Sequence, residues 1–211
     1  NYSGIYIAIR RGPMKIPDDA TKVFQAITDV ASSGAIETDT AAFPFDLQYT
    51  TFTNEASNFS YNSSVNDRLR GITYLGSTGA LELKSSATAA ETAANSYLAF
   101  KANGMDVTRF DGWGTREAVF LNFKRAPGFM DVTNYYFADA TSSYAHNLTV
   151  VPEMIIVKNR AISNAWIVWH TALGTGFRVS LNTNAAKSSI DTVVVNAANF
   201  WLKPPGDGNT I

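Results

Sequence analysis

One short phrase that occurs twice constrains this chain more than any other feature. Residues 7–13 read Ile-Ala-Ile-Arg-Arg-Gly-Pro, and residues 121–127 read Leu-Asn-Phe-Lys-Arg-Ala-Pro. In each case apolar residues at alternate positions lie on one face of an extended strand. Two cations follow, and a proline, which has no N–H to give to a ladder, ends the strand. We interpret the phrase as the beginning of one structural unit that is present twice.

Further landmarks recur in the same order after both copies of the phrase. They are Ser32-Ser33 with Ser142-Ser143, Pro44 with Pro152, Leu75-Gly76 with Leu173-Gly174, and Leu83 with Leu181. The offset falls from 127 − 13 = 114 to 181 − 83 = 98, because loops shorten in the second copy, and loops absorb such changes cheaply. The sequence therefore predicts a duplication, with units at residues 1–114 and 115–211. The alternative is that short strands and turns align by composition alone.

The spacing of the predicted strands indicates the fold class. Short runs typical of strands recur about every 10 residues with turn residues between them, which is typical of antiparallel sandwiches and jelly rolls. Among them are two strands that are entered through a proline, at residues 43–49 and 151–158. Residues 84–94 are rich in Ala, Ser and Thr but lack an apolar stripe, so we expect a turn or loop there. Residues 54–67 are polar and predict a long loop, and residues 68–74 predict a strand. We expect an all-β chain of two tandem antiparallel β-sandwich or jelly-roll-like modules.

Composition excludes several classes of partner. Lys and Arg number 17 against 18 for Asp and Glu, so the formal charge is -1, and no basic cluster is present for a nucleic acid or an anionic membrane. The chain has no cysteine, so disulfides, thiolate nucleophiles and thiolate metal ligands are excluded. The chain has no run of 18 or more apolar residues, so the sequence predicts no membrane-spanning helix. The chain begins at Asn1 and ends where a new strand is expected, at Ile211, so we interpret it as part of a longer or processed polypeptide.

The residues that usually carry catalysis show no pattern that predicts an active site. His146 and His170 each stand without a partner at metal-ligand spacing, so we predict structural roles for them and no metal or cofactor. No Gly-x-Ser-x-Gly elbow occurs, and residues 174–176, Gly-Thr-Gly, predict a hairpin turn. Asp106, Asp111 and Glu117 are close in sequence and are interpreted as solvated acids; the alternative is a carboxylate pair of the glycosidase type, since such pairing is spatial. We therefore expect a protein that is not an enzyme.

Aromatic residues are the better functional signal, because a ring offers a flat apolar face to sugar C–H groups. Trp113 lies between two glycines and is the first candidate for glycan binding, together with Tyr135 and Tyr136. The other interpretation is that Trp113 packs under the loop between the units. Trp166 and Trp169 lie in a dense apolar run and are predicted to be core.

Several segments of the sequence, including the repeated phrase, resemble a known family. Residues 6–15, 124–132, 146–148, 151–158, 166–174 and 181–186 resemble, in this order, a repeat found in long structural proteins of tailed phages, especially marine ones. The resemblance implies a virion component of a tail fibre, an appendage or a capsid-attached decoration, with no enzymatic residues to transfer, and it implies a homo-oligomer, commonly a trimer. The first copy departs from the family pattern, since Phe-Asp-Leu-Gln at residues 45–48 replaces a strand of the Met-Ile-Ile-Val type.

Three hypotheses for function follow. The first is a non-enzymatic phage structural protein, located in the virion after assembly in the host cytoplasm and in contact with other virion proteins. The second is a lectin-like module that recognises a host surface glycan. The third is a depolymerase acting on polysaccharide, which the lack of a catalytic pattern places last.

Overall fold

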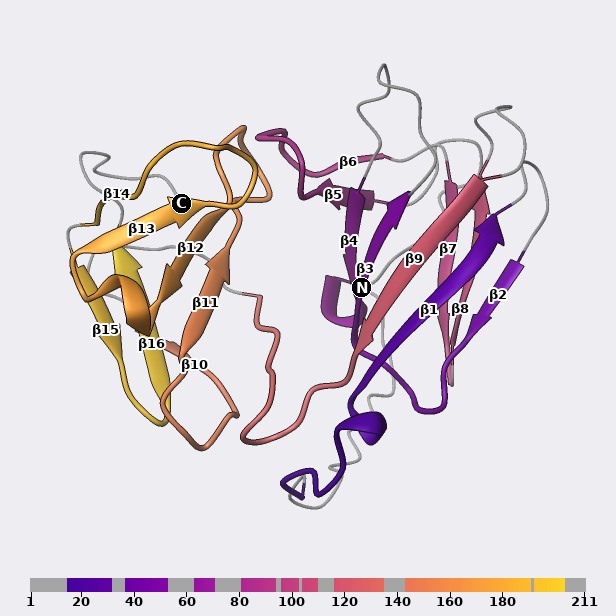
Figure 1. Ribbon diagram of the computed structural model, residues 1–211, viewed down its shortest axis with the longest axis horizontal. Helices are drawn as coiled ribbons and strands as arrows, with labels where there is room; N and C mark the ends of the chain where they lie inside the picture. Colours follow the sequence, from indigo (N-terminus) through magenta and orange to yellow (C-terminus); the bar gives the residue numbers. More distant parts are fainter. Residues whose placement is uncertain are drawn as a thin grey trace, which may run out of the picture.

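A computed structural model gives the fold (Figure 1). It describes residues 15–31, 37–52, 63–70, 81–93, 96–102, 104–109, 116–134, 143–190 and 192–203. Within these ranges the chain has strands and short 3-10 helices and no α-helix, and every pair of neighbouring strands is antiparallel. The predicted all-β class is confirmed. No helix in the described part of the chain has the length and apolar character to cross a membrane.

The first half of the chain forms two sheets, one of six strands in the order β1-β9-β3-β4-β5-β6 and one of three in the order β2-β8-β7. Their bounds are β1 (Phe24–Ala31), β2 (Glu37–Thr40), β3 (Leu47–Phe52), β4 (Ser63–Asp67), β5 (Leu81–Lys84), β6 (Thr92–Ala93), β7 (Ser96–Lys101), β8 (Gly104–Arg109) and β9 (Arg116–Phe123). The 3-10 helices η1 (Ala20–Lys22) and η2 (Arg68–Arg70) precede β1 and follow β4.

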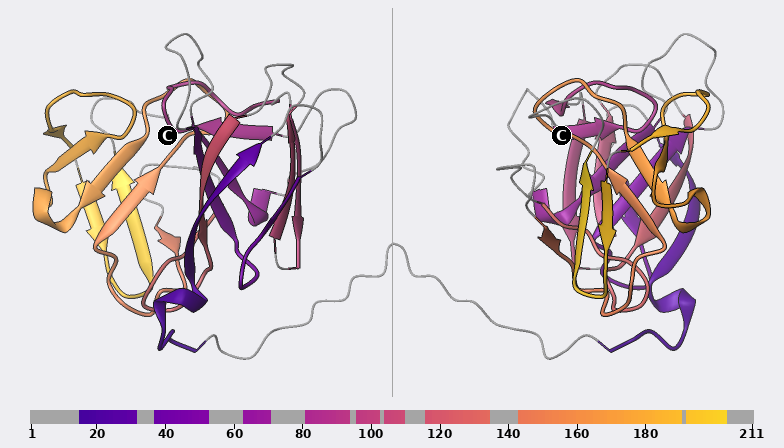
Figure 2. Two further views of the ribbon diagram at one scale, coloured as in Figure 1. Left: turned by 45° about the vertical axis from the view of Figure 1, so that its right-hand side comes forward. Right: turned by 90° about the vertical axis from the view of Figure 1, so that its left-hand side faces the viewer.

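The second half forms a sheet of four strands in the order β11-β12-β13-β14 and one of three in the order β10-β16-β15. Their bounds are β10 (Tyr144–Ala145), β11 (Met154–Val157), β12 (Ile167–His170), β13 (Phe177–Ser180), β14 (Ser188–Ser189), β15 (Thr192–Val195) and β16 (Asn199–Lys203), with the 3-10 helix η4 (Thr171–Leu173) after β12. Figures 1 and 2 show the two halves side by side, joined by the segment that leaves β9.

Each half has its own apolar core. In the first half Phe43, Phe45 and Met105 are buried together, and Phe100 packs against them. In the second half Val157, Ile167 and Trp169 form the centre, with Ile190 beside them. The run at residues 43–49 was predicted as a strand, but β3 begins at Leu47 and the preceding phenylalanines belong to the core.

The large sheet of the first half contains a row of carboxamides. Gln25 of β1, Asn122 of β9, Gln48 of β3 and Asn66 of β4 are successive register partners, so their side chains lie on one face of four neighbouring strands. Gln48 and Asn122 are fully buried, and Gln48 Nε2 donates to Asn122 Oδ1 at 2.9 Å. This row explains why β4 escaped prediction: its polar residues are typical of a loop, yet they face other buried polar side chains.

The sheets of the two halves share strand order. The run β3-β4-β5-β6 corresponds to β11-β12-β13-β14, and β2-β8-β7 corresponds to β10-β16-β15. The register of the four-stranded runs also agrees. In the first run the paired residues are Thr50 with Ser64, Ser64 with Lys84 and, three residues before Lys84, Leu81 with Ala93. In the second they are Val157 with Ile167, Ile167 with Ser180 and, three residues before Ser180, Phe177 with Ser189.

Candidate functional site

The junction between the halves is built around β9. This strand lies after the predicted unit boundary at residues 114 and 115, yet it pairs with β1 on one side and β3 on the other. Lys124, just beyond its end, donates its N–H to Val23 O at 2.8 Å, and Phe123 O accepts from Asp46 N–H at 2.8 Å. The strand that begins the predicted second unit is therefore held within the sheet of the first half.

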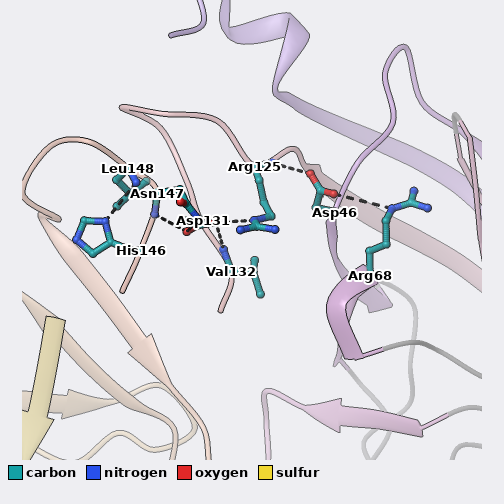
Figure 3. A network of polar contacts seen from close by, with 8 residues as sticks. All are labelled: Asp46, Arg68, Arg125, Asp131, Val132, His146, Asn147 and Leu148. Carbon is teal, nitrogen blue, oxygen red and sulfur yellow. Dashed lines mark hydrogen bonds and ion pairs between the residues drawn. The ribbon is translucent and has the colours of Figure 1, made fainter. Parts of the chain in front are cut away.

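Asp46 fixes the chain as it leaves β9 (Figure 3). Its Oδ2 accepts the backbone N–H of Arg125 at 2.8 Å, and its Oδ1 lies 3.9 Å from Arg68 Nε. Arg68 in turn donates to Phe45 O and Lys101 O, each at 2.9 Å from Nη2. The guanidinium thus links β3, β4 and β7 at one end of the first half.

Asp131 forms the second centre of the same network, and only 4% of its side chain is exposed. Its Oδ1 accepts from Arg125 Nε and from Val132 N–H, and its Oδ2 accepts from the backbone N–H of Asn147 at 2.8 Å. Figure 3 shows this carboxylate between the segment leaving β9 and the segment that follows β10. A single buried acid therefore joins the linker to the second half.

His146 completes the network on the side of the second half (Figure 3). Its Nδ1 accepts Leu148 N–H at 3.2 Å, and its Nε2 lies 3.0 Å from Asn196 O. Because Nδ1 accepts, the ring donates to that carbonyl through Nε2. His170 has a similar local role, because its Nδ1 accepts Ala172 N–H at 3.0 Å at the start of η4.

Contacts between side chains and backbone also cross from one half to the other. Trp166 Nε1 donates to Lys84 O at 2.8 Å, and Arg160 forms an ion pair with Glu91 at 2.8 Å. Lys158 Nζ donates to Thr88 O at 3.0 Å, and burial lowers the pKa of this lysine below its ordinary value. These contacts connect the region around β5 and β6 to the segment between β11 and β12.

Four exposed apolar residues lie along β11 and just before it. Val150, Val151, Met154 and Ile156 are 45 to 55% exposed. Ile155 and Val157 alternate with them and pack into the core. β11 pairs with β12 on one side, and no described strand pairs with its other side.

The predicted glycan site lies outside the described residues, since Trp113, Tyr135 and Tyr136 fall in ranges that the structure does not describe. Asp111 is also outside, as is the side chain of Asp106. Trp166 and Trp169 are 5% and 3% exposed, which confirms the prediction that they are core.

The described side chains include no group of three or more His, Asp or Glu that could hold a metal ion. Sequence reasoning missed the network of Asp46, Arg125 and Asp131. The available signal was an acid, Asp131, six residues after the arginine of the repeated phrase.

Comparison with known proteins places the chain in a family without assigning it an activity. No curated protein and no solved structure matches it significantly. A family model described as a domain of unknown function, DUF7483, matches residues 56–202, well over half of the chain. The match runs from the residues before β4 to β16, so it includes the junction around β9 and Asp131. The chain belongs to the DUF7483 family.

Proposed function

We propose that the chain is a non-enzymatic structural component of a tailed-phage particle, built of two tandem antiparallel β-sandwich modules of the jelly-roll type. The observation that carries this proposal is the recurrence of strand order and register between the two halves. A duplicated sheet unit explains this recurrence directly, and the sequence landmarks at both copies of the phrase agree with it. The resemblance to phage repeat proteins is the reason for placing the chain in a phage particle.

The mechanism of such a component is rigidity. β9 begins the second unit but occupies a central position in the sheet of the first, so the units cannot separate without breaking two ladders. The buried carboxylate of Asp131 holds the linker beyond β9, and the Trp166 indole and the Arg160–Glu91 pair add contacts farther along. These features favour a stiff rod segment over two freely hinged domains.

Within the particle we place the chain in a tail fibre, a tail appendage or a capsid-attached decoration, in contact with other virion proteins. The test is a reconstruction of the particle at side-chain resolution, with mass spectrometry of purified virions. We expect density that fits both halves in the relative orientation of Figure 1. Absence of the protein from purified particles would refute the proposal.

A further inference from the structure

The outer edge of β11 has backbone groups available to another strand. Thr171 N–H donates to Glu153 O at 2.9 Å, so the odd-numbered residues of this segment direct their N–H and C=O groups toward β12. Successive residues of a strand direct their N–H and C=O groups to opposite edges, so Met154 and Ile156 direct these groups to the edge away from β12. Their side chains are 55% and 45% exposed. Two donors and two acceptors therefore lie beside an apolar surface, the combination that strand addition uses.

The first half shows what occupies the corresponding edge. Register equivalence places Met154 and Ile156 at the positions of Leu47 and Tyr49 in β3. There β9 is paired, with Phe123 opposite Leu47 and Leu121 opposite Tyr49. All four of these β3 and β9 side chains are half-buried, so the added strand shields apolar surface on the outer face of the sheet.

The chain carries a second copy of the phrase that includes the end of β9. Residues 5–11 read Ile-Tyr-Ile-Ala-Ile-Arg-Arg, and the repeated phrase aligns Ile7 with Leu121 and Ile9 with Phe123. We propose that residues 5–11 of a second copy of this chain add as a strand to the open edge of β11. Ile7 then lies opposite Ile156, and Ile9 lies opposite Met154. This inference deepens the proposed function and depends on the duplication within it.

An acid at the start of the edge strand also agrees with this register. In the first half Asp46, which precedes Leu47, binds the backbone of Arg125. In the second half Glu153 precedes Met154 in the same way and is exposed, and the phrase aligns Arg11 with Arg125. In the first half the acid at the start of the edge strand accepts the backbone N–H of the arginine at the end of the paired strand, and Glu153 is placed to accept the N–H of Arg11 in the same way.

The expected assembly is head to tail, because the donating segment and the accepting edge are different surfaces of one chain. Such heterologous contacts produce rings or open chains rather than two-fold dimers. An open chain of copies would extend the rod in one direction, which suits a fibre segment.

Disulfide trapping between two single-cysteine variants tests the proposal. The sequence has no native cysteine, so only the introduced thiols can form disulfides. Directly opposed residues whose backbones face each other lie about 5.5 Å apart at Cα, within the range that a disulfide spans. We mix Ile7→Cys chains with Ile156→Cys chains that carry a mass tag and oxidise them mildly. The expected product is the mixed dimer of the two variants. Ala8→Cys is the matched control, since its side chain points to the other face and should lose that product.

Two outcomes would overturn the proposal. One is that Ile7→Cys and Ile156→Cys chains form no mixed dimer, or form no more of it than Ala8→Cys and Ile156→Cys chains do. The other is a disulfide within a single chain of the Ile7→Cys/Ile156→Cys double variant at high dilution, which would show that the strand comes from the same copy.

Sedimentation of the full chain gives a second and independent measurement. Ile156→Pro removes an N–H on the open edge without removing a bond to β12, and Ile156→Thr keeps that N–H. We expect self-association with the native sequence and with Ile156→Thr, weaker association with Glu153→Arg, and its loss with Ile156→Pro. Unchanged thermal unfolding of each variant shows that the fold is intact. Equal self-association of Ile156→Pro and Ile156→Thr refutes strand addition. The proposed function is tested by a different measurement, the presence of the protein in virions.

Discussion

Asp131→Asn provides the most demanding test of the junction, because it changes one atom of a buried side chain. The carboxylate uses both oxygens: Oδ1 accepts from Arg125 Nε and Val132 N–H, and Oδ2 accepts from Asn147 N–H at 2.8 Å. An amide must place its NH2 group where one oxygen was, so a donor then faces another donor. Arg125, only 22% exposed, also loses its opposite charge.

The magnitude follows from these losses. A hydrogen bond to a charged group contributes about 1.5–3 kcal/mol, and a buried donor left without an acceptor costs a similar amount. We expect Asp131→Asn to lower the free energy of unfolding by about 2–4 kcal/mol. Equilibrium denaturation in urea, followed by tryptophan fluorescence, measures it, and amide exchange at Asn147 should speed up in parallel.

Asp18→Asn is the matched control for this prediction. Asp18 bonds Lys15 and Lys22 at the surface, with 57% of its side chain exposed, and these contacts lower its pKa. Exposed pairs of this kind contribute little to stability. If Asp131→Asn and Asp18→Asn shift the unfolding midpoint equally, the junction does not depend on the buried carboxylate and the reasoning is wrong.

Three further predictions concern other parts of the chain. Trp166→Phe removes the bond to Lys84 O and should cost about 0.5–1.5 kcal/mol and expose the connection between the halves to limited proteolysis, whereas Trp169→Phe, whose indole bonds Gly174 O within the second half, should leave that connection protected. Gly174→Ala should cost about 1–3 kcal/mol, because φ 81° and ψ 169° suit glycine alone, while Gly176→Ala, which has open space around it, should change the melting temperature little. Burial lowers the pKa of Lys158, so the unfolded chain holds this proton more tightly and the free energy of unfolding should rise with pH toward 10.5. Urea titrations at several pH values should show that Lys158→Met removes this rise. Asp18 raises the pKa of Lys22, so Lys22→Met should instead remove a fall in the free energy of unfolding at high pH.

The sequence predicted fold class well where side chains alternate between an apolar core and solvent. Around β11 the core residues Ile155 and Val157 alternate with exposed Met154 and Ile156, and the strand was predicted there. The prediction of a loop over residues 54–67 was wrong for β4, because Ser64 and Asn66 are buried against other polar groups. Polarity normally signals solvent, and only the register of three neighbouring strands reveals that these residues face one another.

The site was less predictable than the fold. The importance of Asp131 depends on Asn147 and Arg125 meeting at one carboxylate, and no local pattern shows that. The landmark Leu83 with Leu181 was displaced by two residues, since the ladders equate Leu83 with Val179. Leu181 instead follows β13, where it is 48% exposed and donates its N–H to Trp166 O.

The two halves share one backbone register, but their interiors differ in chemistry. At equivalent positions the first half buries Gln48 and Thr50, and the second half packs Ile155 and Val157 inward. Backbone ladders tolerate either kind of side chain, because their hydrogen bonds come from N–H and C=O groups that every residue but proline supplies. Low identity between the copies is therefore compatible with one duplicated unit. The same reasoning applies to the edge of β11: what β9 offers to β3 is mainly its backbone and an alternating apolar face, and residues 5–11 have both.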